Sequence, residues 1–111
     1  MRWDFSKLLN DIKSGIKKAF EQTNGSIKSI GVDSWGVDFG LIGSDGRLLE
    51  NPYHYRDKRT DGMMEKAFQL MPRRSIYNST GIQFMQLNTI YQLLSLKLNA
   101  PQLLQKTKKL L

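Results

Sequence analysis

The sequence predicts an α/β fold in which a short β-hairpin sheet is packed by helices. Two observations carry this prediction: a helix-spaced apolar stripe covers residues 5–20, and β-rich segments follow at residues 27–32 and 37–42. The second half of the chain has the pattern of helices separated by loops, which would cover such a sheet. With 111 residues, 40% of them hydrophobic and 24% charged, the chain has the size and composition of one globular domain or less.

The first helix is the clearest element of the sequence. Its apolar side consists of Phe5, Leu8, Leu9, Ile12, Ile16, Ala19 and Phe20. Asp4 is a suitable N-cap because its carboxylate can accept hydrogen bonds from the first free backbone amides, and Asn24-Gly25 supplies a stop. An apolar stripe of this kind has to be buried, so we expect this helix to lie on the strands that follow it.

Three strands are expected after the helix. Residues 27–32 and 37–42 are rich in Ile, Val and Phe, and the second of these segments alternates apolar and small or polar residues. Asp45-Gly46 is a strong hairpin signal, which returns the chain as a third strand at residues 47–49. Pro52 then ends the pairing.

Four helices are expected in the second half. They are a stripe from Met64 to Met71, a short helix over residues 74–80, a helix capped by Asn88, and a last helix that starts at Pro101 and runs to Leu111. The chain thus opens at a helix and stops within one. This pattern predicts that the chain is a piece of a longer protein.

The net charge of +7 raises the question of nucleic-acid binding. The lysines are dispersed, however, over the polar side of the first helix and over the C-terminal segment. Dispersed lysines of this kind are typical of a solvated helix face. We therefore expect no nucleic-acid partner, and a basic nucleic-acid-binding module is the weakest of the functional alternatives.

The residue types that are missing exclude several function classes. No run approaches the roughly 20 apolar residues that a membrane span requires, so we expect no membrane partner. The chain has no cysteine, and His54 is its only histidine, which leaves no donor set for a zinc site. The first residues contain no apolar signal core, and the expected location is the cytoplasm.

Gly31 and Gly36 have the same spacing as the two glycines of a phosphate-binding loop. Such a loop needs a lysine and a hydroxyl residue directly after the second glycine, but Val37 and Asp38 stand there. No lysine would reach the phosphates, and the carboxylate would repel them. The sequence therefore contains no nucleotide loop of this type.

Aromatic residues occur together with polar residues that can hydrogen-bond to hydroxyl groups, a combination that suits sugar binding. The aromatic members are Trp35, Tyr53, Tyr55 and Tyr91, and the polar members are Asp38, Arg56, Gln83 and Asn88. Aromatic faces stack on the C–H faces of sugars, and carboxylate, guanidinium and amide groups match their hydroxyls. The same residues also line ordinary loops, and the carboxylates of Asp33, Asp38 and Asp57 suit helix caps as well as acid–base or magnesium chemistry.

Several blocks of the sequence resemble the FGGY family of carbohydrate kinases. They are residues 29–42 (SIGVDSWGVDFGLI), 45–47, 52–60 (PYHYRDKRT), 62–64, 76–77, 80–84 (TGIQF) and 88–93 (NTIYQL). The blocks occur in order over nearly the whole chain. The Trp-Gly-Val-Asp-Phe and Thr-Gly-Ile-Gln-Phe blocks resemble the members of the family that act on L-rhamnulose.

This resemblance implies a partial actin-like or ribonuclease-H-like lobe, with residues 1–111 as part of an N-terminal FGGY kinase domain. The family uses ATP and magnesium, and the expected reaction transfers the γ-phosphate to the 1-hydroxyl of L-rhamnulose. The resemblance implies that Gly36 contacts the sugar. The other expected members of the sugar pocket are Asp38, Arg56, Asp57, Gln83 and Asn88.

The resemblance also defines what this chain lacks. The family's N-terminal phosphate loop, its catalytic aspartate and its second, nucleotide-binding lobe have no counterpart in residues 1–111. Phosphoryl transfer needs these parts together, so no catalytic or metal-binding residue is assigned, tight binding of ATP or magnesium is not expected, and the isolated chain should be inactive. The alternative is a non-catalytic protein that forms a homodimer through an unpaired sheet edge.

Overall fold

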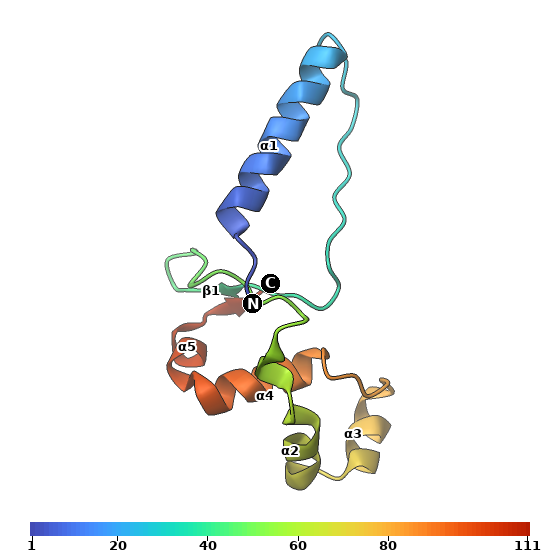
Figure 1. Ribbon diagram of the computed structural model, residues 1–111, viewed down its shortest axis with the longest axis vertical. Coiled ribbons are helices and arrows are strands. Elements are labelled where there is room, and N and C mark those ends of the chain that lie inside the picture. The colour runs from blue at the N-terminus through green and yellow to red at the C-terminus, as the bar shows by residue number, and fades with distance from the viewer.

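The computed structural model describes residues 1–111 as an elongated molecule in which α1 extends away from the rest of the chain (Figure 1). Its elements are α1 (Phe5–Gln22), β1 (Leu41–Ile42), the 3₁₀ turn η1 (Lys58–Thr60), α2 (Met63–Leu70), α3 (Arg73–Thr80), α4 (Thr89–Asn99), α5 (Pro101–Lys106) and β2 (Lys109–Leu110). The radius of gyration is 18.1 Å, against about 13 Å for a compact domain of this length. A helix outside the core accounts for this excess.

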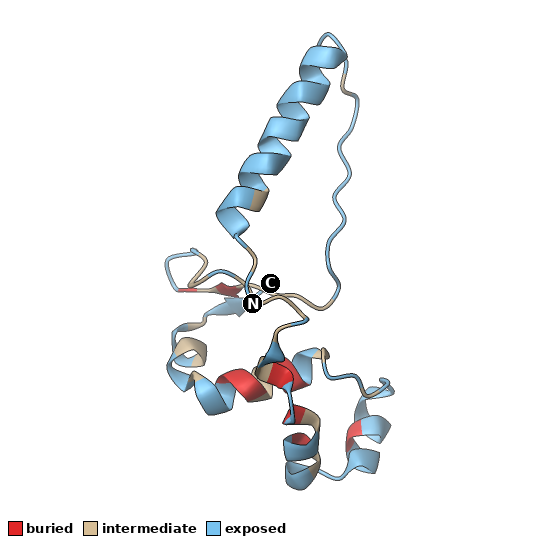
Figure 2. Cartoon of the chain, in the orientation of Figure 1, coloured by how far each residue is buried: buried red, intermediate tan, exposed pale blue.

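The core lies in the helical half, where α2 packs on α4. Met63 and Ala67 of α2 and Tyr91 of α4 are buried together, and Phe84 packs against them. The Phe68 ring meets Phe84 edge-on, with 5.3 Å between the ring centroids. Figure 2 shows that the buried residues gather in this half and in β1. This packing confirms the prediction of helices in the second half of the chain.

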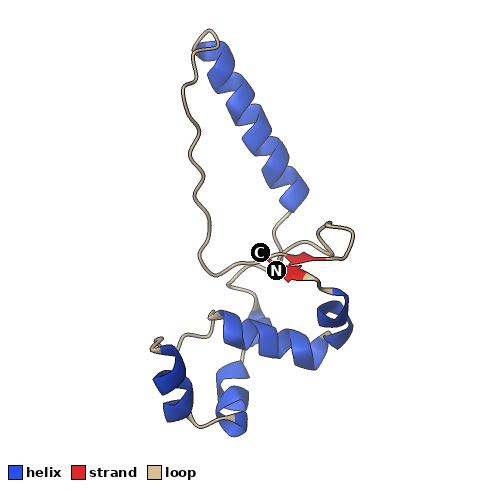
Figure 3. Ribbon diagram, turned by 180° about the vertical axis from the view of Figure 1, so that it is seen from behind, coloured by secondary structure: helices blue, strands red, loops and turns tan.

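A two-stranded sheet joins the helical half to α1, as the rear view shows (Figure 3). β1 pairs antiparallel with β2, with Leu41 opposite Leu110 and Ile42 opposite Lys109. The amide of Gly40 donates to the Leu111 carbonyl at 2.7 Å and extends the ladder by one residue. A small antiparallel sheet packed by helices confirms the predicted α/β class.

The partner strand of β1 was not predicted. We expected a helix from Pro101 to Leu111, but α5 ends at Lys106, where Thr107 adopts an extended conformation. The Lys108 amide then donates to the Ile42 carbonyl at 2.7 Å. The prediction was wrong because β1 offers unpaired backbone groups, and this long-range pairing outweighs the local helical preference.

The predicted three-stranded sheet is also wrong in its details. Residues 27–32 form no strand, and of residues 37–42 only Leu41 and Ile42 do. The third strand is reduced to one isolated bridge between Leu48 and Ile42. Residues 27–39 make no backbone–backbone hydrogen bond, because no neighbouring strand within residues 1–111 lies beside them.

α1 has the ends that the sequence predicts. The Asp4 carboxylate accepts a hydrogen bond from the Lys7 amide at 2.9 Å, and Gly25 follows the helix in a left-handed conformation with φ +79°. The expectation that this helix lies on the sheet is wrong, since α1 has no buried residue (Figure 2). Most of its apolar stripe is exposed, namely Phe5, Leu9, Ile12, Ile16 and Phe20.

Replacing Asp4 by alanine should lower the helix content of α1. The exchange removes the side-chain acceptor of the Lys7 amide, and losing an N-cap costs about 1 kcal/mol of helix stability. Circular dichroism at 222 nm, measured on Asp4→Ala and on Asp4→Asn, tests this prediction. Asparagine can still cap the helix, so an equal loss in both variants would contradict it.

Candidate functional site

A pocket of about 310 Å³ opens between the residues before β1, α3 and the start of α4. Three of the six predicted sugar-site residues line it, namely Gly36, Gln83 and Asn88. The rest of the lining is mostly apolar and consists of Val37, Ile76, Thr80, Ile82, Phe84, Thr89, Ile90 and Tyr91. An apolar pocket with a few polar groups at its edge is the usual form of a small-molecule site.

The loop from residue 81 to residue 88 forms one wall of this pocket. It starts at Gly81, whose φ of +63° ends α3, and the Thr80 hydroxyl accepts from the Ile82 amide at 3.2 Å. The Asn88 side-chain amide donates to the Gln83 carbonyl at 2.7 Å and closes the loop. Asn88 stands at the N-cap position of α4 without capping it through its side chain.

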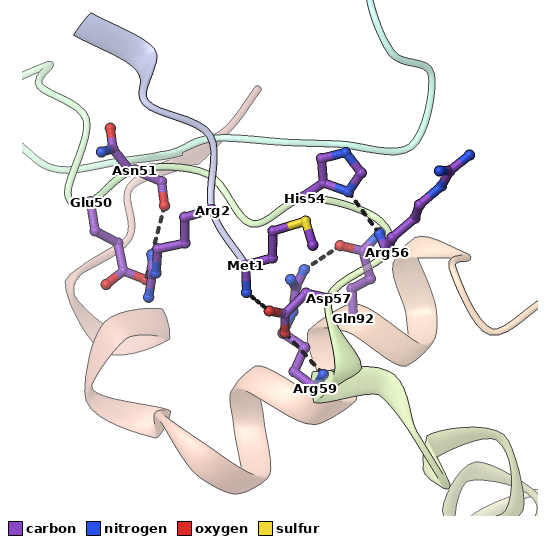
Figure 4. A network of polar contacts seen from close by, with 9 residues as sticks. All are labelled: Met1, Arg2, Glu50, Asn51, His54, Arg56, Asp57, Arg59 and Gln92. Atoms are coloured by element: carbon purple, nitrogen blue, oxygen red, sulfur yellow. Dashed lines mark hydrogen bonds and ion pairs between the residues drawn. The ribbon is translucent and has the colours of Figure 1, made fainter. Parts of the chain in front are cut away.

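Gln92 connects the two walls of the pocket. It is 1% exposed on the inner face of α4. Its amide nitrogen donates to the Val37 carbonyl at 3.0 Å and to the Leu87 carbonyl at 2.7 Å, and its amide oxygen accepts from the Arg59 guanidinium (Figure 4). Sequence reasoning missed Gln92, although a glutamine on the otherwise apolar face of a helix was an available signal.

The Arg59 guanidinium sits between Gln92 and the Tyr53 ring, whose centroid lies 3.9 Å from its central carbon. Burial lowers the pKa of Arg59 from its ordinary value, and the nearby Asp38 carboxylate is one of the groups that oppose this shift. The backbone carbonyl of Arg59 also accepts from the Ser95 hydroxyl at 2.7 Å. Arg59 therefore holds η1 against the inner face of α4.

Arg56 and Asp57 lie apart from this pocket, in a more open one of about 300 Å³ that Gln86 and Leu87 of the 81–88 loop also line. The Asp57 carboxylate accepts from the Arg59 amide at 2.9 Å and pairs with the Met1 ammonium group (Figure 4). The Arg56 guanidinium lies over the Tyr55 ring, 5.2 Å from its centroid. Within this chain, Asp57 thus caps η1, while the Arg56 guanidinium pairs with no carboxylate.

Asp38 lies in neither of these two pockets, and it contacts a cluster of aromatic rings. Its carboxylate accepts from the Trp3 indole at 2.5 Å, and its other oxygen is buried without a partner. Trp3 in turn contacts Trp35 and His54, with 4.4 and 4.5 Å between the ring centroids. The six predicted site residues are therefore divided into three neighbouring groups.

The side chains present offer no site for a magnesium ion or for nucleotide phosphates. No three carboxylate or imidazole groups converge on one point, and no lysine stands directly after the Gly31–Gly36 segment. The residues of this chain do not by themselves fit a magnesium–nucleotide complex. None of the helices combines the length and the hydropathy that a membrane span requires.

Above about pH 10 the buried Tyr91 should make the protein less stable. Burial raises the pKa of the Tyr91 phenol, so the unfolded chain loses this proton at a lower pH than the folded chain does. The free energy of unfolding should therefore fall as the pH rises from about 10 through the raised pKa. Urea unfolding at pH 9 and pH 11 should show a smaller fall for Tyr91→Phe than for the parent chain.

The exposed Tyr77 provides the matched control for this pH dependence. Tyr77→Phe should lose as much stability as the parent chain between the two pH values. If the free energy of unfolding fell as much in Tyr91→Phe as in the parent chain, Tyr91 would not be the cause of the fall.

The sequence blocks around the pocket are those of a family of sugar kinases. The model of the N-terminal domain of the FGGY family of carbohydrate kinases matches residues 1–111. The chain belongs to this family, which confirms the assignment from its sequence blocks.

Within the family, the chain is similar to rhamnulokinases. It is 42% identical over 109 residues to the rhamnulokinase of Halalkalibacterium halodurans, a match that covers 98% of this chain and 23% of the relative. The corresponding values for the rhamnulokinase of Bacteroides thetaiotaomicron are 43%, 98% and 22%. The chain thus spans less than a quarter of the length of these relatives, which confirms that it corresponds to part of the N-terminal lobe.

A solved structure supports the fold assignment. The gluconate kinase of Lactobacillus acidophilus superimposes with a TM-score of 0.63 at 25% sequence identity. The match covers 83% of this chain and 19% of the gluconate kinase. The small sheet and the helices around it therefore have the arrangement of one part of a sugar kinase.

Proposed function

We propose that residues 1–111 form part of the sugar side of the cleft in an ATP-dependent kinase that phosphorylates L-rhamnulose at its 1-hydroxyl. The pocket beside Gly36, Gln83 and Asn88 is the observation that carries this proposal. Its volume of about 310 Å³ lies at the lower end of the range for small-molecule sites, which suits a monosaccharide. The similarity to rhamnulokinases supports the choice of sugar.

Each polar group of the pocket has a role that suits a sugar. The Gln83 side chain is exposed at the pocket rim, where its amide can donate to one hydroxyl and accept from another. The Asn88 amide nitrogen is used within the loop, which leaves its oxygen as an acceptor. A Cβ at Gly36 would meet no atom within 4 Å, so this glycine leaves room for a ligand to approach the backbone.

We propose Arg56, Asp57 and Asp38 as further residues of the sugar pocket. Arg56 and Asp57 line the more open pocket together with Gln86 and Leu87 of the 81–88 loop, so one ligand that lies across this loop would contact both groups. The unpartnered carboxylate oxygen of Asp38 is buried, so it would accept from a sugar hydroxyl only after the aromatic rings beside it move. In this arrangement the sugar would have acceptors and donors on both sides of the loop.

Phosphoryl transfer needs more than this chain contains. Family membership implies the use of ATP and magnesium, which would supply the transferred phosphate and neutralise its charge. Because the chain spans only 23% of the relative's length and so contains only part of the cleft, we propose that it binds the sugar weakly, with a dissociation constant of about 1 mM or more. The residues present do not fit the nucleotide. A coupled assay of ADP release with ATP, magnesium and L-rhamnulose should therefore show no turnover.

Sugar binding itself is tested by NMR. L-rhamnulose, titrated into the ¹⁵N-labelled chain, should shift the amide signals of Gly36, Gln83 and Asn88 more than those of α1. Gly36→Ala should abolish these shifts while the fold is kept, because the added methyl group takes ligand space without a clash.

Gly31→Ala is the matched control for the titration, since a Cβ at Gly31 also meets no atom within 4 Å and Gly31 does not line the candidate sugar pocket. Equal shifts in the two variants, or no shifts in the parent chain, would count against the proposed site.

A second candidate function is that of a non-catalytic protein that forms a homodimer. One observation favours it: residues 27–39 make no backbone–backbone hydrogen bond and offer an edge to another chain. Light scattering on the purified chain tests it, because a stable dimer would have twice the chain mass of 12.8 kDa.

A further inference from the structure

The side-chain amide of Gln92 has only one orientation that satisfies its neighbours. The Arg59 guanidinium can only donate, so it takes the amide oxygen (Figure 4). The carbonyls of Val37 and Leu87 can only accept, so they take the amide nitrogen, at 3.0 and 2.7 Å. Because Gln92 is 1% exposed, turning the amide over would leave buried groups without partners, at a cost in stability. Arg59 therefore keeps the nitrogen of Gln92 directed at the two carbonyls.

The pocket wall that contains Gly36 depends on contacts of this kind. Residues Gly36 to Asp38 make no backbone–backbone hydrogen bond. Side chains hold the segment instead: the Trp3 indole donates to the Asp38 carboxylate, and Gln92 donates to the Val37 carbonyl. The contact of Gln92 is the one that acts on the backbone, because it fixes the peptide group one residue after Gly36.

The opposite wall, the 81–88 loop, is connected to Gln92 as well. The Asn88 side chain closes this loop internally, so this contact does not set the position of the loop relative to the other wall. The Leu87 carbonyl supplies that link, since it accepts from the same amide nitrogen as the Val37 carbonyl. One buried side chain is thus hydrogen-bonded to both walls of the pocket.

Gln92 itself lines neither the candidate sugar pocket nor the more open pocket of Arg56 and Asp57. Its effect on a ligand would therefore pass through the backbone of the two walls. A site that is already ordered before it binds loses less conformational entropy on binding, and this preorganisation raises affinity. The fixed amide of Gln92 can provide such preorganisation.

We infer that Gln92 is a positioning residue of the sugar pocket, which holds the Val37 and Leu87 walls at one separation while Arg59 fixes the direction of its amide. This inference rests on the proposed function, because it concerns the same pocket. It goes beyond a contribution of Gln92 to stability, since it predicts that sugar affinity and the order of the walls depend on the two N–H groups of the amide.

Gln92→Glu tests the role of these N–H groups. The introduced carboxylate has nearly the size of the amide and still accepts from Arg59, but it has no N–H for the two carbonyls. In the variant without ligand, the ¹⁵N order parameter of the Asp38 amide, which shares a peptide group with the Val37 carbonyl, should fall from about 0.85 to below about 0.6. The amides of α2 should keep the values of the parent chain.

Sugar affinity is measured by titrating L-rhamnulose into the ¹⁵N-labelled chain and following the amide of Gln83. The dissociation constant should rise by about tenfold in Gln92→Glu, because the walls must be ordered when the sugar binds. Ala67→Gly is the matched control, since it weakens α2 in the adjacent core and Ala67 does not line the pocket. It should lower the midpoint of urea unfolding and leave the dissociation constant unchanged.

The parent chain provides a readout that needs no variant. Saturating L-rhamnulose should shift the side-chain amide signals of Gln92, although Gln92 lies outside the pocket, because both its N–H groups are bonded to the walls. The side-chain amide of Gln102, which is exposed on α5, should not shift. This readout decides the matter if Gln92→Glu does not fold.

Three results would overturn the positioning role. They are an unchanged order parameter at Asp38 in Gln92→Glu, a loss of affinity in Ala67→Gly as large as in Gln92→Glu, and an unshifted Gln92 amide in a parent chain that binds the sugar. A parent chain that binds no L-rhamnulose would instead refute the proposed function. In that case the order parameter at Asp38 still decides whether Gln92 holds the two walls.

Discussion

Replacing Gln92 by leucine should lower the free energy of unfolding by about 2 to 4 kcal/mol. The exchange leaves the Arg59 guanidinium and the carbonyls of Val37 and Leu87 without their shared partner. Buried polar groups without partners cost about 1 to 3 kcal/mol each, and charged groups cost more. Urea unfolding followed by circular dichroism measures the effect, and complete loss of a cooperative transition is its extreme form.

Gln102→Leu is the matched control because Gln102 is exposed on α5 and takes part in no hydrogen bond of its side chain. It should change the free energy of unfolding by less than about 0.5 kcal/mol. If Gln92→Leu also stayed within this limit, the three contacts of Gln92 would not hold the walls of the pocket together.

Replacing Tyr91 by alanine should destabilise the protein by about 3 to 5 kcal/mol, the range for large aromatic residues in cores. Tyr91 is 1% exposed, forms the core with Met63 and Ala67, and meets the Phe68 ring edge-on. Its removal would open a cavity beside the candidate sugar pocket, which Tyr91 also lines. The midpoint of urea unfolding should fall accordingly.

Tyr77→Ala is the control for this exchange, since Tyr77 is 51% exposed on α3. It should cost less than about 1 kcal/mol. Equal losses in the two variants would mean that the contact between α2 and α4 is not the main source of stability in the helical half.

Local chemistry made several elements predictable. Asp4 and Gly25 bound α1 as expected because caps and left-handed glycines act within a few residues. The stripe of α2 was predictable for the same reason, since its helical spacing is visible in the sequence. The family blocks identified Gly36, Gln83 and Asn88 as candidates, and these three residues line one pocket.

Long-range contacts were not predictable from such signals. The residues after Lys106 have a helical pattern, but they pair with β1 because its backbone groups would otherwise lack partners. The hydrogen bond from the Trp3 indole to Asp38, which is 35 residues away in sequence, had no signal in the sequence. Gln92 was missed because its importance depends on three segments that only the fold brings together.

The sequence by itself determined the helices, apart from the end of α5, as well as the class of the fold and the family. Tertiary structure decided which residues share a pocket, which strand pairs with β1, and that α1 and residues 27–37 have no partner within the chain. The physical reason is the range of the interactions. Capping and helical periodicity act over a few residues, whereas strand pairing and burial depend on groups that are distant in sequence or belong to another part of the domain.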